Sequence, residues 1–220
     1  MNDVTFQLKK WTGDFGRKYT KRNTYSIRDL DEFYNNIYGV TRTALNRSFL
    51  TGMSKSSRIL EVGCNVGNQL LCLQKAGFRN LYAIEPQADA VKCAQNRVFG
   101  ATVITGNAFD IPFKDKYFDL VYTSGVLIHI NPRHIKKALQ EIYRCSNAYI
   151  WGFEYYAEKY EEISYRGYSK LLWKTNFPRL FTSMFPDLKV QKIKLLKYSE
   201  NDNVDVMYLL RKTSKDNKQY

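Results

Sequence analysis

The sequence predicts an α/β protein built on a doubly wound, mostly parallel seven-stranded sheet with helices on both faces. One observation is that short apolar runs alternate with helix-like segments between residues 58 and 153. This alternation is typical of parallel strands, because parallel neighbours need a crossover connection that is usually a helix. The second observation is a pair of apolar segments near the end of the chain with no helix between them. That pair predicts an antiparallel hairpin at the C-terminal edge of the sheet.

Each element can be assigned to a stretch of sequence. The expected parallel strands are RILEV (58–62), NLYAIE (80–85), ATVIT (101–105), YFDLVYTS (117–124) and NAYIWGF (147–153). The expected connecting helices are 67–78, 87–100 and 132–144. The third of these should have Asn131 as its N-cap and Pro132 in its first helical position. The expected edge hairpin, which completes a Rossmann-like sheet, consists of LKVQKIKLLKY (188–198) and VDVMYLLRK (204–212).

We expect a single domain over residues 1–220, with two additions to the sheet. Residues 1–55 should form an N-terminal helical cap, which includes a helix over 30–50 that continues through Gly39. Residues 155–175 should form a lid insertion, because the strand–helix rhythm stops there and tyrosine becomes frequent.

The composition narrows the classes of protein that remain possible. The net charge is +13, but the basic excess is spread along the chain, so it does not by itself indicate a nucleic-acid-binding stripe. No apolar run approaches the ~20 residues of a membrane span, and the start of the chain lacks the apolar core of a secretion signal. The 4 cysteines contain no C-x-x-C spacing. We therefore expect reduced thiols, no bound metal and a cytoplasmic location.

The loop after the first expected strand, in ILEVGCNVGNQLLC (59–72), discriminates between two cofactors. A dinucleotide-binding loop needs glycine at its third and sixth positions, where backbone amides approach a pyrophosphate. Asn65 and Asn68 occupy those positions, and Glu61 would face the pyrophosphate. An acid at the end of this strand suits a cationic ligand better.

S-adenosylmethionine carries an ammonium and a sulfonium and has no phosphate, so it fits this pattern. Glu61 could hold the ammonium, while Gly63 and Gly67 let the backbone turn beneath the ribose and the methionine portion, beside Asn65. Glu85 ends the second strand, where an acid can accept hydrogen bonds from ribose hydroxyls. The sequence therefore favours S-adenosylmethionine as the cofactor.

The ends of the next two strands extend the same pattern. In GNAF (106–109), Asn107 could contact the adenine edge, with Ala108 beside it. Phe109 and Pro86 offer apolar faces to the adenine ring. In TSGVLIH (123–129), the residues expected beneath the reacting methyl group are Thr123, Gly125 and Val126. Four successive strand ends thus supply groups of the kinds that this cofactor needs.

This array resembles the class I S-adenosylmethionine-dependent methyltransferases. A closer resemblance is to the pseudaminic acid biosynthesis-associated methylases. The segments that carry it are WTGDFGRKYTKRN (11–23), GVLIHINP (125–132), EIYRCSNAYI (141–150), EYY (154–156), EISYRGY (162–168) and FPDLKV (185–190). The resemblance implies a single methyltransferase domain and a sugar-like acceptor of the nonulosonic-acid or nucleotide-activated class. The chain departs from the expected glycine-rich loop at Cys64 and Asn65.

Two residues are candidates for the general base that a hydroxyl acceptor would need. His129 follows the fourth strand, although a packed histidine bonded to the backbone is an equally good interpretation. Glu154 ends the fifth strand, where it could instead pair with Arg166. An amine acceptor needs no base and would be methylated by alignment alone.

The remaining candidates come from the cap and the lid. Tyr19 and Arg22 (or Asn23) could reach the carboxylate of the cofactor, although this segment could also be a basic surface helix. The candidates for acceptor binding, which could equally be packing residues of the insertion, are Tyr155, Tyr156, Tyr165 and Arg166.

Two rival functions remain open. The charge of +13 suggests a nucleic-acid methyltransferase, but TSGV differs from the N-P-P-[YF] signature of enzymes that methylate a flipped base, and no RNA-binding module is apparent. The other rival is a non-catalytic methyltransferase-like binding subunit, against which the intact acids and glycines of the loop argue. The sequence leaves a monomer or a homodimer possible.

Overall fold

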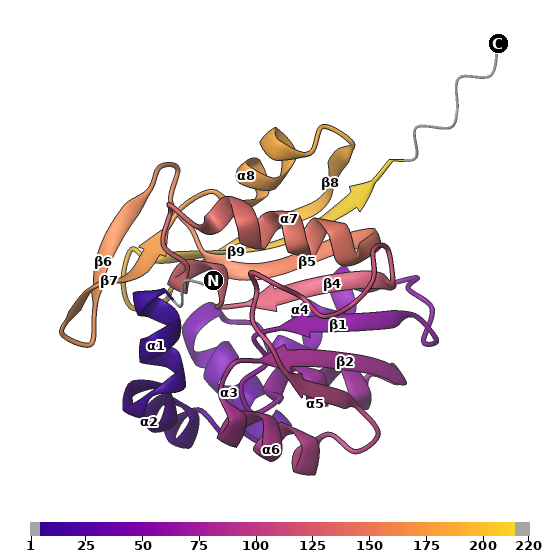
Figure 1. The fold of residues 1–220 in the computed structure, drawn as a ribbon, viewed down its shortest axis with the longest axis horizontal. Helices are drawn as coiled ribbons and strands as arrows, with labels where there is room; N and C mark the ends of the chain where they lie inside the picture. Colours follow the sequence, from indigo (N-terminus) through magenta and orange to yellow (C-terminus); the bar gives the residue numbers. More distant parts are fainter. Residues whose placement is uncertain (1–4, 214–220) are drawn as a thin grey trace.

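The computed structural model describes residues 5–213 and has the predicted architecture (Figure 1). Its main sheet has seven strands in the order β3-β2-β1-β4-β5-β9-β8. The five strands from β3 to β5 are parallel, whereas β9 runs antiparallel to both β5 and β8. The predicted fold class is therefore confirmed, including the antiparallel hairpin at the C-terminal edge.

The bounds of the elements agree closely with the sequence pattern through the parallel part of the sheet. The strands are β1 (Arg58–Val62), β2 (Asn80–Glu85), β3 (Thr102–Thr105), β4 (Phe118–Ser124), β5 (Ser146–Tyr155), β6 (Glu161–Tyr165), β7 (Tyr168–Lys174), β8 (Leu188–Lys197) and β9 (Val204–Lys212). The α-helices are α1 (Phe6–Thr12), α2 (Asp14–Arg22), α3 (Ile27–Tyr38), α4 (Arg42–Phe49), α5 (Asn68–Lys75), α6 (Ala88–Arg97), α7 (Ile135–Cys145) and α8 (Phe177–Met184). A 3₁₀ turn, η1 (Leu127–His129), follows β4.

The two faces of the sheet carry separate apolar cores. Successive side chains of a strand point to opposite faces, so Ile59 enters one core and Leu60 the other. The first core receives apolar side chains from α3, α4, α5 and α6, and the second from α7 and α8. Strands buried on both faces have near-continuous apolar sequences, which is why RILEV and NLYAIE predicted their strands correctly.

Two predicted helices differ from the structure. Residues 30–50 form parts of two helices, because Gly39 adopts a left-handed conformation (φ +66°) and ends α3, after which Thr41 caps α4. The helix predicted to start at Pro132 starts instead at Ile135. The Asn131 side chain accepts a hydrogen bond from the backbone of Arg133 and so stabilises a turn before the helix rather than the helix end itself.

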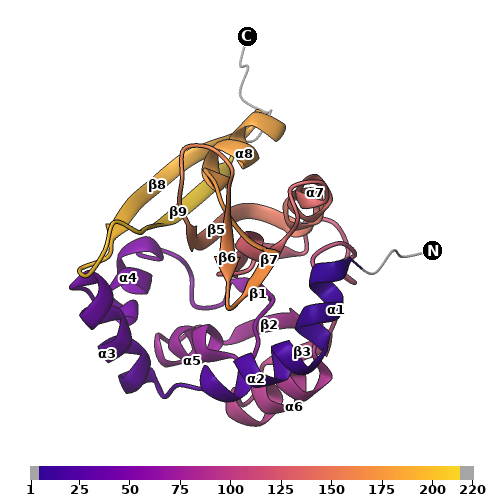
Figure 2. The same ribbon diagram turned by 90° about the vertical axis from the view of Figure 1, so that its left-hand side faces the viewer.

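The segment predicted as a lid contains the hairpin β6–β7, which lies beside α1 (Figures 1 and 2). Arg166 and Gly167 form its turn with positive φ angles of 51° and 79°, the geometry of a tight two-residue hairpin turn. Gln7 of α1 donates to the carbonyl oxygen of Lys170 at 2.8 Å, and Phe15 of α2 packs edge-on against Tyr165. The hairpin and the first two helices therefore form one continuous wall.

Close packing explains a glycine in the WTGDFG segment. A β-carbon on Gly16 would lie 1.7 Å from the carbonyl oxygen of Trp11 and 2.7 Å from the Gln87 side chain. Only glycine therefore lets α2 fold back against both α1 and the start of α6. Within the described part of the chain, no helix is long and apolar enough to cross a membrane.

Candidate active site

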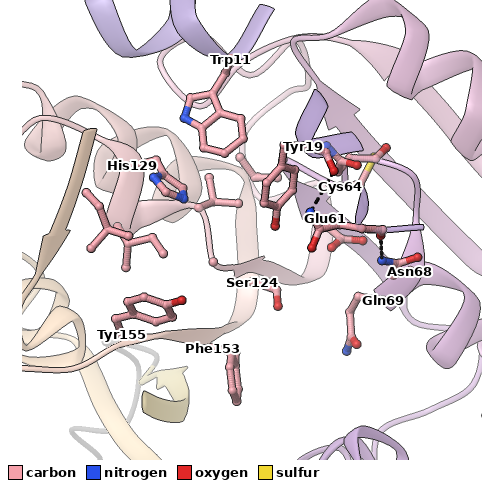
Figure 3. A pocket seen from close by; sticks show the side chains of 18 of the residues that line it. Trp11, Tyr19, Glu61, Cys64, Asn68, Gln69, Ser124, His129, Phe153 and Tyr155 are labelled. Atoms are coloured by element: carbon pink, nitrogen blue, oxygen red, sulfur yellow. Dashed lines mark hydrogen bonds between the residues drawn. The ribbon is translucent and has the colours of Figure 1, made fainter. Parts of the chain in front are cut away.

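A cavity of about 460 Å³ lies at the carboxyl ends of the parallel strands. Its wall combines side chains of α1, α2 and α3, the loops after the first four parallel strands, hairpin β6–β7 and the region between β8 and β9. Trp11, His129 and Tyr155 lie on one side of it, and Glu61, Asn68 and Gln69 on the other (Figure 3). Most of the predicted site residues line this cavity, namely Tyr19, Glu61, Gly63, Asn65, Glu85, Pro86, Asn107, Ala108, Phe109, Gly125, Val126, His129, Tyr155, Tyr165 and Arg166.

The glycine loop after β1 is shaped by two glycines with different neighbours. Gly63 has φ +77°, and a β-carbon there would lie 2.7 Å from a methyl group of Val126, so glycine keeps the cavity floor open. Gly67 also has φ +77°, but its α-carbon faces Val98 and Ala94 of the α6 region. Gly67 does not line the cavity and instead allows α5 to begin close to α6.

Two buried carboxylates line the cavity at the ends of β1 and β2. Glu61 accepts a hydrogen bond from the Tyr122 hydroxyl at 2.7 Å, and burial raises its pKa to about 8. Glu85 accepts bonds from the backbone N–H groups of Asn65 and Gln87, both at 3.0 Å, and burial raises its pKa to about 7. Because burial disfavours the charged form, a cationic or hydrogen-bond-donating ligand would compensate both groups.

The asparagines that replace loop glycines bind the N-terminal helices. The Asn65 side chain donates to the Thr20 hydroxyl at 3.0 Å, and that hydroxyl donates to the Gln87 side chain at 3.2 Å. The Asn68 amide donates to the carbonyl oxygen of Asn23 and accepts from the backbone of Tyr25. These contacts connect the glycine loop to α2 and to the segment that follows it.

The ends of β3 and β4 place further candidates in the wall. The Asn107 side-chain oxygen accepts from the backbone of Phe109 at 2.8 Å, which orients the amide and leaves its N–H₂ group for a ligand. Thr123 is buried and does not line the cavity. Its hydroxyl bonds to Glu154 and helps to lower the pKa of that carboxyl.

Glu154 faces the protein interior. Its side chain is fully buried and lies outside the cavity wall. The carboxylate accepts from the backbone N–H groups of Val126 and Ile128, at 3.2 and 3.4 Å, and forms no ion pair with Arg166. Burial raises its pKa to about 7 despite these bonds. This placement does not support a general base and indicates a residue that positions η1.

His129 lines the cavity in a defined orientation. Its Nδ1 lies 2.8 Å from the carbonyl oxygen of Leu171, which can only accept, so Nδ1 carries the proton and Nε2 carries a lone pair. The ring packs against Trp11 and Tyr165, with centroid separations of 4.5 and 5.3 Å. Removal from water lowers the pKa of His129 to about 4, so the ring stays neutral at ordinary pH.

Two other candidates lie away from the cavity. Arg22 is exposed, and its predicted contact with a cofactor carboxylate is not supported by this position. The Tyr156 hydroxyl donates to Glu158 outside the cavity wall. In both cases the neighbouring residue, Asn23 or Tyr155, occupies the wall instead.

Arg42 is a site residue that the sequence interpretation missed. Its side chain is 1% exposed, lines the cavity and donates to the Tyr34 hydroxyl at 2.7 Å and the Ser124 hydroxyl at 3.2 Å. No carboxylate forms an ion pair with it anywhere in residues 5–213. The available signal was a charged residue one turn before Leu45 on the buried face of its helix.

Three buried polar atoms in the cavity wall have no hydrogen-bond partner among the described residues. They are Trp11 Nε1, Gln69 Oε1 and Asp205 Oδ1. Unsatisfied buried groups are costly in a folded protein, so these atoms mark where ligand groups would bond. Asp205 was also missed, although it is an acid within an otherwise apolar strand.

Part of the chain matches a known protein family. Residues 60–148 match the family model described as a methyltransferase domain. A phosphoethanolamine N-methyltransferase of Plasmodium falciparum is 24% identical over 95 residues, which cover 42% of this chain and 36% of that protein. The chain spans about two fifths of the length of the curated relatives it matches (39%, 36% and 43%).

Two solved structures share the fold over most of both chains. A Pyrococcus horikoshii protein has a TM-score of 0.64 and 15% identity, covering 89% of this chain and 95% of that one. A Burkholderia thailandensis 1,6-didemethyltoxoflavin-N1-methyltransferase, solved with S-adenosylhomocysteine, has a TM-score of 0.65 and 12% identity, covering 91% and 90%. Residues 60–148 thus carry a methyltransferase domain, and the two solved structures share the fold of this chain. The matched domain indicates S-adenosylmethionine as the cofactor.

Proposed function

We propose that the protein transfers the methyl group of S-adenosylmethionine to a small polar acceptor, of the nonulosonic-acid or nucleotide-activated sugar class. The observation that carries this proposal is a single cavity. The buried acids Glu61 and Glu85 line it together with aromatic and polar side chains. Such a cavity can hold cofactor and acceptor together and away from water, which methyl transfer by in-line displacement requires.

The residues present fit the cofactor. Gly63 leaves space where a side chain would meet Val126, and the buried Gln69 Oε1 has no hydrogen-bond partner in the described part of the chain. We assign the ammonium to Glu61 and Gln69, and the carboxylate to Arg42, whose planar guanidinium suits a carboxylate. The ribose hydroxyls are assigned to Glu85 and the adenine to Asn107, Phe109 and Pro86.

The reaction needs little chemistry from the protein. When bound, S-adenosylmethionine supplies an electrophilic methyl group on its sulfonium. Trp11, Tyr19 and Tyr165 line the cavity and would exclude water from it. For a hydroxyl acceptor, His129 Nε2 would take the proton, while the Leu171 carbonyl holds the ring in the correct tautomer. We propose that Glu154 is a positioning residue, because it fixes the backbone just before His129.

The sugar-like acceptor is supported by the wall and by the sequence resemblance. Tyr155 and Tyr165 offer flat faces and hydroxyl groups, and Arg166 brings a cation to the cavity mouth for an acceptor carboxylate or phosphate. We place the reaction in the cytoplasm, since the 4 cysteines are free thiols.

Two measurements test the proposal in order. Calorimetry should show binding of S-adenosylmethionine and S-adenosylhomocysteine and no binding of NAD; the reverse pattern would overturn the cofactor assignment. Mass spectrometry of nucleotide-activated sugars, incubated with the protein and methyl-labelled cofactor, should then show label on a sugar. Label found only on added RNA would favour the nucleic-acid methyltransferase. Tight cofactor binding with no transfer to either class would favour a binding subunit.

A further inference from the structure

A buried aspartate lies in the cavity wall away from the glycine loop. Asp205 is 1% exposed, lies at the start of β9 and is paired in register with Tyr155 of β5. Its Oδ2 accepts from the hydroxyls of Tyr38 and Tyr198, at 2.5 and 3.3 Å. Its Oδ1 has no partner among the described residues. Two tyrosines therefore fix the carboxylate by one oxygen, and the other oxygen is left without a partner in a residue that lines the cavity.

No cation within residues 5–213 forms an ion pair with this carboxylate. The cations whose charge it senses are Lys174 and Arg42, but neither lies within ion-pair distance of it. Arg42 is engaged by Tyr34, Asn46 and Ser124. A buried carboxylate without a cation is strongly disfavoured, and burial accordingly raises the pKa of Asp205 to about 7. A bound cation would restore the ionised form.

The surroundings of Asp205 are aromatic. Tyr38, Tyr155, Tyr198 and Phe153 all line the cavity, and the ring of Tyr38 lies 5.2 Å from that of Tyr198 and 6.0 Å from that of Phe153. The guanidinium of Arg42 lies 4.7 Å from the Phe153 ring, which leaves the three tyrosines around the carboxylate. Aromatic rings beside one carboxylate are the groups that recognise an ammonium ion in proteins.

We propose that Asp205, with Tyr38, Tyr155 and Tyr198, binds a protonated amino group of the acceptor. The inference rests on the proposed function, in which the cavity holds an acceptor beside the cofactor, and it narrows the acceptor to an aminated molecule. The bound ammonium anchors the acceptor and is not itself methylated, because a protonated nitrogen has no lone pair for the methyl group. Asp205 is thus a specificity-determining residue.

The first test uses the protein saturated with S-adenosylhomocysteine, and it measures binding of ethanolamine and of ethylene glycol by calorimetry. The two probes differ in one group, ammonium against hydroxyl. Ethanolamine should bind at least about tenfold more tightly, since hydrogen bonds to charged groups are the stronger class. Equal binding of the two probes, or no binding of ethanolamine, would overturn the inference. The heat of S-adenosylhomocysteine binding is recorded first, so a failure of the cofactor assignment is seen separately.

Variants then locate the ammonium site. Asp205→Asn keeps the shape but removes the charge, and it should abolish the preference for ethanolamine while leaving S-adenosylhomocysteine affinity unchanged. Asp187→Asn is the matched control, because Asp187 also accepts a tyrosine hydroxyl, from Tyr143 at 2.8 Å, but lies outside the cavity. A preference that survives in Asp205→Asn would place the ammonium elsewhere. If that variant does not fold, the affinities of the parent protein for ethanolamine and ethylene glycol still decide whether the cavity binds an ammonium group.

Discussion

The cavity has two halves that are built in different ways. The half that we propose for the cofactor consists of Glu61, Gly63, Glu85 and Asn107, which lie at or just beyond the ends of β1, β2 and β3. The half that we propose for the acceptor consists of Tyr38 of α3, Tyr155 at the end of β5, Tyr198 between β8 and β9, and Asp205 at the start of β9. The first half lies within the matched methyltransferase domain or at its edge, and the second lies wholly outside it. In this proposal most of the cofactor contacts come from one continuous stretch, with Arg42 added from α4, whereas acceptor choice depends on contacts between distant segments.

The largest expected effect concerns His129, which lines the cavity. If the acceptor is a hydroxyl, His129→Ala should lower turnover by about 10²–10⁴, because removal of a general base typically costs that factor. Affinity for S-adenosylhomocysteine should barely change. Turnover at the parent rate would favour an amine methylated by alignment, and the Glu154→Gln variant, assayed beside it, tests the other base predicted from the sequence.

The next effect tests whether Arg42 belongs to the cofactor half. Arg42→Gln should weaken S-adenosylhomocysteine binding by about 100-fold, since a buried charge-assisted contact to the carboxylate is lost. Methylthioadenosine has no carboxylate, so its affinity should stay the same. Calorimetry with both ligands checks this, and Arg22→Gln serves as the exposed control. Equal weakening of both ligands would show that Arg42 only supports the fold.

A substitution of Glu85 should weaken the binding of both ligands, whereas a substitution of Arg42 should weaken only one. Glu85→Ala removes a carboxylate that both S-adenosylhomocysteine and methylthioadenosine would contact through their ribose. Both affinities should fall by roughly 10- to 100-fold, the range expected for charge-assisted hydrogen bonds worth about 1.5–3 kcal/mol. A folded variant with unchanged affinity for either ligand would remove Glu85 from the cofactor half.

The contrast between the halves also explains what the sequence could predict. Glu61 and Glu85 were identified because parallel strands end at one edge of the sheet, so residues at successive strand ends converge there. Arg42 and Asp205 could not be identified in this way. Their positions depend on how α3 and α4 pack and on the register of β9 against β5, and no local pattern specifies either. The β6–β7 hairpin was not predicted, because the segment was interpreted from its tyrosines as a lid and the turn residues Arg166 and Gly167 were not recognised.

A smaller effect concerns the junction of the glycine loop with α2. Asn65→Gly keeps the left-handed backbone (φ 47° in the parent) but removes the bond to Thr20. Loss of this bond should cost about 1–3 kcal/mol of stability, or roughly 2–4 °C of melting temperature for each kcal/mol. Thr20→Val removes the same bond from the other side. Melting temperatures of the two single variants and the double variant should be non-additive, and strict additivity would contradict a shared contact.

The last prediction concerns the pH dependence of stability that the buried acid Glu61 should cause. Its pKa is about 8 in the folded protein and near 4.5 when unfolded, so between these values the folded state holds a proton that the unfolded chain has released. Stability should therefore fall as pH rises from about 5 to 8, and Glu61→Gln should reduce that fall. Melting curves of ligand-free protein across this range check it, with exposed Glu200→Gln as control. A variant whose pH profile matches the parent would show that Glu61 is not the group that titrates.

The hydrogen bonds from Asn65 to Thr20 and from Asn68 to Asn23 should couple the attachment of the N-terminal helices to the binding of the cofactor. Detachment of α1 and α2 would expose their backbone amides to solvent, and the loop that these helices contact is the one that we propose for the cofactor. Linkage is reciprocal, so cofactor binding must slow this exchange by the same factor by which an attached pair of helices tightens binding. The rate of amide exchange in residues 6–22 should therefore report whether the cofactor is bound, and its measurement needs neither an acceptor nor turnover.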